Sequence, residues 1–124
     1  FTPNETEASF YVNHKVETKE EAKQAANKLL DKGIKNVIIT LGEKGAYFAN
    51  NKENFMSEAF VLKNKIVDTT GAGDAFNAGL AVALTENKNI EESIRFANAV
   101  GALSTTKIGT AKSMPLREEI DNLV

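Results

Sequence analysis

The sequence predicts an α/β fold with a mostly parallel sheet. Thr18-x-x-Glu21 is a capping box, which marks the start of a helix. The β-branched run Val37–Leu41 suits a strand that is buried on both faces. Phe1–Pro3 has the character of a strand end. The resulting order of strand, helix and strand predicts a parallel pairing.

The other elements follow in order along the chain. The first helix is expected to end near Lys32, because Gly33 sits where a C′ glycine belongs. We assign no element to Phe10–Val16. Further strands are predicted at Ala46–Ala49, Ala59–Leu62 and Ile66–Val67, and helices at Asp74–Glu86, Ile90–Thr105 and Leu116–Leu123. The chain contains no internal repeat or linker, so we expect one domain or part of one.

Composition excludes several classes of protein. The chain has 124 residues, 42% apolar and 26% charged, as in ordinary globular domains. The net charge of −2 without a Lys/Arg cluster argues against nucleic-acid binding. The absence of cysteine excludes disulfides and thiolate chemistry. No apolar run approaches the roughly 18 residues of a membrane span, so we expect no membrane partner and a cytoplasmic location.

The stretch Asp68–Phe76 is the most informative part of the sequence. Its Gly71-Ala72-Gly73 turn precedes an apolar, helix-prone run, so several backbone N–H groups should be free at a helix N-terminus. Such a terminus attracts phosphate. Asp74 adds a negative charge beside that anion, which makes sense if it accepts a proton from a hydroxyl that attacks a phosphoryl group.

Two commoner glycine motifs do not fit. The third glycine of a dinucleotide fingerprint would fall at Phe76, which argues against an oxidoreductase, and no Gly-Lys-Ser/Thr follows at P-loop spacing. An ordinary glycine turn with Asp74 as N-cap stays open as the alternative.

The stretch from Asp68 to Leu80 resembles the C-terminal signature of the ribokinase (PfkB) family of sugar kinases. Three further segments are similar to motifs of that family and occur in the family order. They are Thr2–Ala8, Thr40–Gly45 and Lys107–Pro115. The resemblance implies a three-layer, Rossmann-like α/β/α fold and ATP-dependent phosphorylation of a sugar.

The resemblance assigns roles to individual residues. Asp74 would be the catalytic base and contact the sugar, and Gly71, Ala72 and Gly73 would form an anion hole. Asn4 and Glu7 would be linked to Mg²⁺, with helix capping by Asn4 as the alternative. The positions similar to ATP-binding ones are Asn4, Thr40, Leu41, Gly42, Glu43, Lys44, Gly45, Gly73, Asp74 and Asn98.

A monovalent cation site, usually for K⁺, is also implied. The matching positions are Asp68, Thr70, Ser104, Lys107, Gly109 and Ser113. A cation there could order the Gly71–Gly73 turn, so activation by K⁺ is expected.

Family members are roughly twice this length or more. We therefore interpret residues 1–124 as the C-terminal, ATP-binding part of such a kinase, without the sugar-binding half and the lid. The wording of Thr2–Ala8 favours ribose as acceptor, with fructose, tagatose phosphate, adenosine and a keto-deoxy sugar acid as alternatives. An inactive nucleotide-binding fragment is a further alternative. The complete enzyme is expected to be a homodimer.

Overall fold

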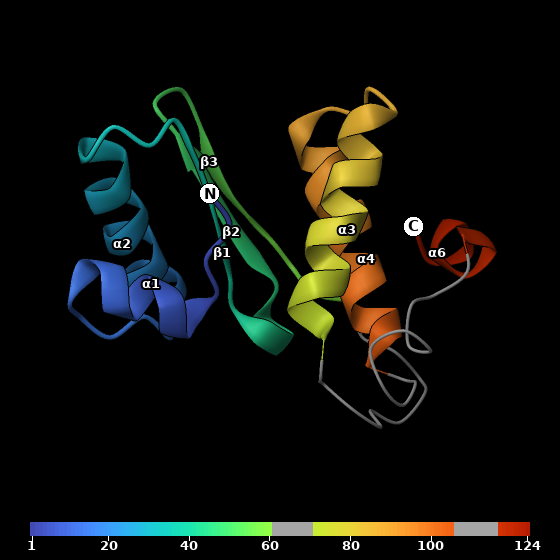
Figure 1. Cartoon of the computed structure of the whole chain (residues 1–124), viewed down its shortest axis with the longest axis horizontal. Coiled ribbons are helices and arrows are strands. Elements are labelled where there is room, and N and C mark those ends of the chain that lie inside the picture. Colours follow the sequence, from blue (N-terminus) through green and yellow to red (C-terminus); the bar gives the residue numbers. More distant parts are fainter. Residues whose placement is uncertain (61–70, 106–116) are drawn as a thin grey trace. The chain divides into compact units, whose positions relative to one another are not determined.

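The computed structural model describes residues 1–60, 71–105 and 117–124 (Figure 1). The chain divides into two compact units, Phe1–Glu58 and Ala59–Val124. The expected positions Asp68, Thr70, Lys107, Gly109 and Ser113 lie outside the described residues.

The first unit combines helices and a sheet. Its elements in chain order are α1 (Glu5–Val12), α2 (Lys19–Asp31), β1 (Asn36–Thr40), the 3₁₀ turn η1 (Gly42–Lys44), β2 (Ala46–Asn50) and β3 (Asn54–Ser57). The predicted capping box of α2 is present, because the Thr18 hydroxyl accepts from the Glu21 N–H. Gly33 ends α2 with a φ of 98°, and its N–H donates to the Leu30 carbonyl, as predicted for a C′ glycine.

The three strands of this sheet pair antiparallel, in the order β1-β2-β3. The sequence predicted mostly parallel pairing, and these strands differ because their connections are too short. A parallel crossover needs a dozen or more residues, whereas only Leu41–Gly45 separates β1 from β2. Parallel pairing occurs where Phe1–Asn4 runs beside β1, with the Ile38 N–H donating to the Phe1 carbonyl at 2.9 Å.

The core of the first unit lies between its helices and one face of the sheet. Figure 1 shows α1 and α2 on the same side of the strands. Small alanines let α2 pack closely, while alternate residues of β1 and β2 point towards it. The buried set is Ala8, Val12, Val16, Ala22, Ala25, Ala26, Leu29, Val37, Ile39, Leu41, Tyr47 and Ala49. Ile38 and Phe48 alternate with this set and are also buried. The burial of Ile38 confirms the prediction that the run Val37–Leu41 is buried on both faces.

The second unit is a helical hairpin with a short closing helix. It contains α3 (Ala72–Thr85), α4 (Ile90–Ser104) and α6 (Arg117–Leu123). Asn87 has a φ of 63° after the end of α3, and Asn89 caps α4 by accepting from the Glu92 N–H. Buried Ala75, Ala83, Phe96, Ala99, Val100, Leu103 and Ile120 form its core.

Arg117 connects α6 to the hairpin. Its guanidinium lies 4.9 Å from the ring centre of Phe96 and donates to both carboxylate oxygens of Glu86, at 2.6 and 2.7 Å. The hydrogen bond from Arg117 lowers the pKa of Glu86. A bidentate arginine–carboxylate pair constrains geometry more than a single hydrogen bond does, so Glu86 fixes the orientation of the Arg117 guanidinium.

Candidate functional site

The start of α3 is an open helix N-terminus. Gly71 is the N-cap with a φ of 80°, a left-handed conformation that glycine adopts without strain. The first intrahelical bond runs from the Ala75 N–H to the Gly71 carbonyl at 2.9 Å. No side chain caps this end within the described residues, whereas side chains cap α1, α2 and α4. The N–H groups of Ala72, Gly73 and Asp74 therefore form the uncapped first turn.

Asp74 is the third residue of α3 rather than its N-cap. The alternative in which Asp74 caps an ordinary glycine turn is therefore wrong, because Gly71 occupies that position. The Asp74 side chain is exposed, whereas Ala75 and Phe76, which follow it, are buried. An accessible carboxylate thus stands in the first turn of α3, at the positive end of the helix dipole and beside backbone N–H groups that no side chain of the described residues caps.

Two further predicted positions lie on α4. Asn98 is buried, with 8% of its surface exposed. Ser104 is fully buried, and its hydroxyl donates to the Gly101 carbonyl at 2.7 Å. The side chain of Ser104 is thus engaged within α4, which leaves its carbonyl as the group to consider for a cation.

In the first unit, Asn4 and Glu7 form a reciprocal capping box at the start of α1. The Asn4 side-chain oxygen accepts from the Glu7 N–H at 2.8 Å, and Glu7 Oε1 accepts from the Asn4 N–H at 3.0 Å. Both residues are exposed. Capping was the alternative to a magnesium role, and the capping geometry is present. Glu7 Oε2 takes no part in the box, so the pair fits a hydrated Mg²⁺ that needs few protein groups.

The Thr40–Gly45 segment is a tight turn beside Asn4. Thr40 ends β1 and bridges to Asn4. Buried Leu41 anchors the turn, and its N–H donates to the Gly45 carbonyl at 2.8 Å. Gly42 and Gly45 have φ values of 57° and 102°, which favour glycine. The structure therefore brings the Thr2–Ala8 segment and the Thr40–Gly45 segment together through the Asn4–Thr40 bridge.

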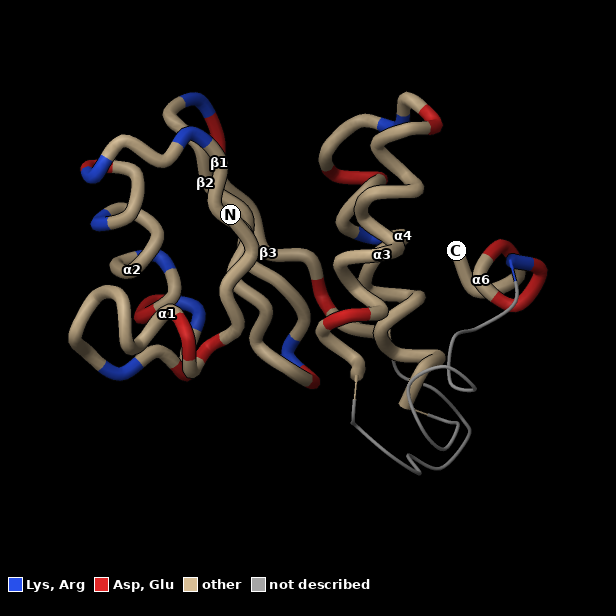
Figure 2. Tube along the Cα trace, in the orientation of Figure 1, with Lys and Arg blue, Asp and Glu red and all other residues tan. Residues whose placement is uncertain are grey.

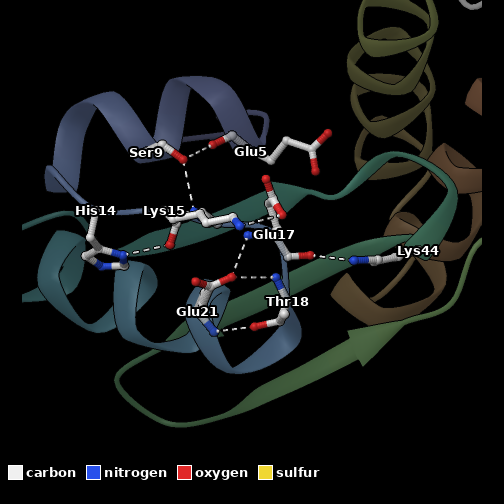
Figure 3. Close-up of polar contacts among 9 residues, drawn as sticks. Glu5, Ser9, His14, Lys15, Glu17, Thr18, Glu21 and Lys44 are labelled. Atoms are coloured by element: carbon white, nitrogen blue, oxygen red, sulfur yellow. Dashed lines mark hydrogen bonds and ion pairs between the residues drawn. The ribbon is translucent and has the colours of Figure 1, made fainter.

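Lys44 has a partner within the protein. Its Nζ donates to the Glu17 carbonyl at 2.7 Å, just before the capping box of α2 (Figure 3). Figure 3 also shows the Glu17 and Thr18 N–H groups converging on the Glu21 carboxylate. Lys44 thus ties η1 to the start of α2, a role that its sequence position did not reveal. Glu43 and Gly42 are exposed.

The charges of the described residues do not gather into one patch. Figure 2 shows Lys and Arg interspersed with Asp and Glu along both units. No group of three or more His, Asp or Glu within residues 1–60, 71–105 and 117–124 could hold a metal ion. In that same part of the chain, no helix combines the length and apolarity needed to cross a membrane.

Glycine turns and a helix N-terminus without a side-chain cap among the described residues are features that suit phosphate binding. Comparison with known proteins shows the family to which the chain belongs. The family model described as "pfkB family carbohydrate kinase" matches residues 1–117. The chain therefore belongs to the pfkB family of carbohydrate kinases. Its fold is that of ribokinase-like enzymes, with mixed helix and strand content.

Several relatives are ribokinases. The chain is 42% identical over 118 residues to the ribokinase of Haemophilus influenzae, which covers 95% of this chain and 38% of that protein. It is 39% identical over 123 residues to the ribokinase of Arabidopsis thaliana, covering 99% of this chain and 32% of that protein. The chain thus spans about two fifths or less of the length of these relatives.

Solved structures show the same likeness. The Arabidopsis thaliana ribokinase complexed with ribose and ATP matches with a TM-score of 0.92 at 38% identity, over 98% of this chain and 39% of that one. The Thermotoga maritima ribokinase matches with a TM-score of 0.84 at 41% identity, over 98% and 40%. Phosphofructokinase-2 of Escherichia coli in complex with potassium has a TM-score of 0.84 at 27% identity, over 98% and 38%.

Proposed function

We propose that residues 1–124 are the C-terminal, ATP-binding part of a sugar kinase that phosphorylates D-ribose to ribose 5-phosphate. The observation that carries the proposal is the N-terminus of α3, which no side chain of the described residues caps, with exposed Asp74 in its first turn. The ribokinase relatives and the ribose and ATP complex of the Arabidopsis protein support the choice of reaction.

In the proposed reaction, Asp74 and the turn before it have separate roles. The Asp74 carboxylate accepts the proton of the attacking sugar hydroxyl. The N–H groups of Gly71, Ala72 and Gly73 donate to the oxygens of the transferring phosphoryl group, whose charge they stabilise. MgATP, when bound, would supply that phosphoryl group and leave as ADP, and its Mg²⁺ would neutralise part of the phosphate charge. Because phosphoryl transfer depends mainly on positioning and charge, these two elements suit it.

The remaining residues are proposed to bind the nucleotide and its metal. Glu7, with Oε2 outside the capping box, would hold hydrated Mg²⁺ together with Asn4. The exposed backbone of the Gly42–Lys44 turn would contact ATP, and buried Asn98 would lie beside the base. Lys44 would act through the turn that it ties to Glu17.

A monovalent cation site is a separate part of the proposal. Asp68, Thr70, Lys107, Gly109 and Ser113 would surround K⁺ together with the backbone of Ser104. The choice of K⁺ as the ion is supported by the Escherichia coli phosphofructokinase-2, which is 27% identical to this chain and whose structure is a complex with potassium. The complete protein is also proposed to be homodimeric, as the family resemblance implies, and cytoplasmic, as the lack of a membrane-length apolar run in the sequence led us to expect.

Another acceptor is the second candidate function. A deoxyribokinase of Salmonella typhi is 36% identical over 121 residues, and phosphofructokinase-2 shares the fold. Fructose, tagatose phosphate, adenosine and a keto-deoxy sugar acid complete the set of alternatives. Groups that select the acceptor are proposed to lie in the part of the relatives that this chain does not span.

A sugar panel tests the proposal. The complete protein that carries residues 1–124 should convert ATP to ADP with ribose at a higher kcat/KM than with any other sugar of the set. Residues 1–124 alone should phosphorylate none of them, since holding the acceptor beside the phosphate supplies about 7–11 kcal/mol of the barrier. A complete protein that is inactive with every sugar, or an isolated segment as active as the complete protein, would contradict the proposal.

A further inference from the structure

α3 and α4 approach each other closely at Gly79. A Cβ placed on Gly79 would lie 2.7 Å from Val100 Cγ2, 3.0 Å from Val100 Cβ and 3.3 Å from the backbone Cα of Ala97. Carbon atoms pack best at about 3.5–4.0 Å. One added methyl would therefore be roughly 1 Å too close to α4.

The α4 residues that face Gly79 cannot easily move to make room for a side chain there. Val100 is 2% exposed, and its β-branched side chain is stiff about χ1. Ala97 presents backbone, which moves only with the whole helix. Separation of the two helices is therefore the available response to a side chain at position 79.

Separation of the helices would reach the start of α3. Gly101 of α4 faces that start, since a Cβ on it would lie 3.4 Å from the Ala72 carbonyl and 3.7 Å from Phe76 Cβ. Ala72 is the first residue of α3, directly before Gly73 and Asp74. The contact at Gly79 thus sets the depth at which the uncapped turn of α3 is seated on α4.

We infer that Gly79 is a positioning residue, which places the α3 N-terminus and Asp74 for phosphoryl transfer by letting α3 approach α4. The inference rests on the proposed function of that turn. Helix propensity alone favours alanine over glycine at a helix interior, so a residue selected only for stability of the helix would not be glycine here.

The test compares two glycines of the same hairpin in the complete protein. In Gly79→Ala the new Cβ would lie 2.7 Å from Val100 Cγ2. In Gly101→Ala the nearest atom to the new Cβ is the Ala72 carbonyl oxygen at 3.4 Å, an ordinary van der Waals contact. A misplacement of about 1 Å can lower a rate about 10²-fold. We expect kcat to fall at least tenfold in Gly79→Ala and to stay within twofold of wild type in Gly101→Ala. Kinetics are measured well below each variant's melting temperature, so that only folded protein is compared.

A second pair of variants covers the case in which Gly79→Ala does not fold. Val100→Ala removes Val100 Cγ2, which would lie 2.7 Å from a Cβ at position 79. It keeps the Cβ of residue 100, which would lie 3.0 Å from that atom. The double variant Gly79→Ala/Val100→Ala should therefore fold, with a kcat that lies below that of Val100→Ala alone but above that of Gly79→Ala where the latter is measurable. Equal kcat values for the double variant and Val100→Ala, or a folded Gly79→Ala with wild-type kcat, would overturn the inference.

Failure of the proposed function is recognised separately. In that case the wild-type protein and Gly101→Ala are both inactive with the whole sugar panel. The dissociation constant of MgATP, measured by calorimetry, then replaces kcat. It should rise at least threefold in Gly79→Ala and stay unchanged in Gly101→Ala, and an unchanged constant in both variants would overturn the positioning role.

Discussion

Glu7 is expected to serve both the capping box of α1 and the binding of magnesium, and the two roles can be separated by substitution. Glu7→Gln keeps an oxygen that can accept from the Asn4 N–H, a bond of 3.0 Å, because Gln also completes a capping box. It removes the negative charge that Oε2 would present to Mg²⁺. Asn4→Ala instead removes the oxygen that accepts from the Glu7 N–H at 2.8 Å.

The expected magnitudes differ between the two variants. Loss of an N-cap side chain costs about 1 kcal/mol of stability, so Asn4→Ala should lower the free energy of unfolding by that amount. Glu7→Gln loses a charge near the helix N-terminus, worth about 0.3–1 kcal/mol at an exposed site, while Glu5 stays in the same turn. Groups that orient a metal's ligands commonly change affinity about 10-fold or more, so Glu7→Gln should raise the half-saturating Mg²⁺ concentration about tenfold.

The assay is kinase rate against free Mg²⁺ at saturating ribose and fixed ATP, with urea unfolding measured in parallel. Glu21→Gln is the matched control, because Glu21 accepts from the Thr18 N–H in the second capping box. It should leave the magnesium curve unchanged. A magnesium curve of Glu7→Gln that superimposes on the wild type would refute a magnesium role and leave Glu7 with capping alone.

Two more predictions follow from the charges and from the proposed cation site. The hydrogen bond from Arg117 lowers the pKa of Glu86 in the folded protein below its ordinary 4.5. The pair therefore stabilises the fold above pH 4.5, and this stabilisation is lost as the pH falls through the folded-state pKa of Glu86. Arg117→Met should therefore flatten the acid limb of stability against pH, and parallel wild-type and variant curves would contradict this. Rates should also be higher in KCl than in NaCl, and Asp68→Asn should abolish the difference. Equal wild-type rates in both salts would argue against the cation site.

Local signals in the sequence predicted most of the helices. The Thr18/Glu21 capping box and Gly33 mark the two ends of α2 through short-range hydrogen bonds, which depend on neighbours in the chain. The observed bounds of α4, Ile90–Ser104, lie within one residue of the prediction.

Elements that depend on distant partners were missed. β3, Asn54–Ser57, has a weak strand pattern and exists because it pairs with β2, with Phe55 opposite Phe48. A strand was predicted instead from Ala59, yet Ala59 and Phe60 belong to none, and the rest of that prediction falls outside the described residues. α1 was left unassigned beyond its cap because only Ala8 and Val12 of its residues are buried.

The candidate site was predictable in its motifs but not in its details. The glycine spacing correctly predicted a turn before α3. The N-cap of α3 is Gly71, because the turn needs a positive φ at that residue. Asp74 is therefore the third residue of the helix, whereas the sequence predicted it as the first. The contacts of Lys44 with Glu17 and of Gly79 with Val100 join segments 27 and 21 residues apart, and no local pattern encodes them.

The role of Asp74 is the central claim, and one substitution tests it most directly. Asp74→Asn keeps the size of the side chain and removes its ability to accept a proton as a base. Loss of a general base lowers the rate about 10²–10⁴-fold. Asp31→Asn, the same change at the exposed last residue of α2, is the control. In the complete protein, Asp74→Asn should lose at least 99% of kcat with ribose, about 10²-fold, while its MgATP dissociation constant and the control's kcat stay near wild type. An Asp74→Asn variant that retains more than about a third of wild-type kcat, well above the 10²-fold loss expected for a base, would contradict the account.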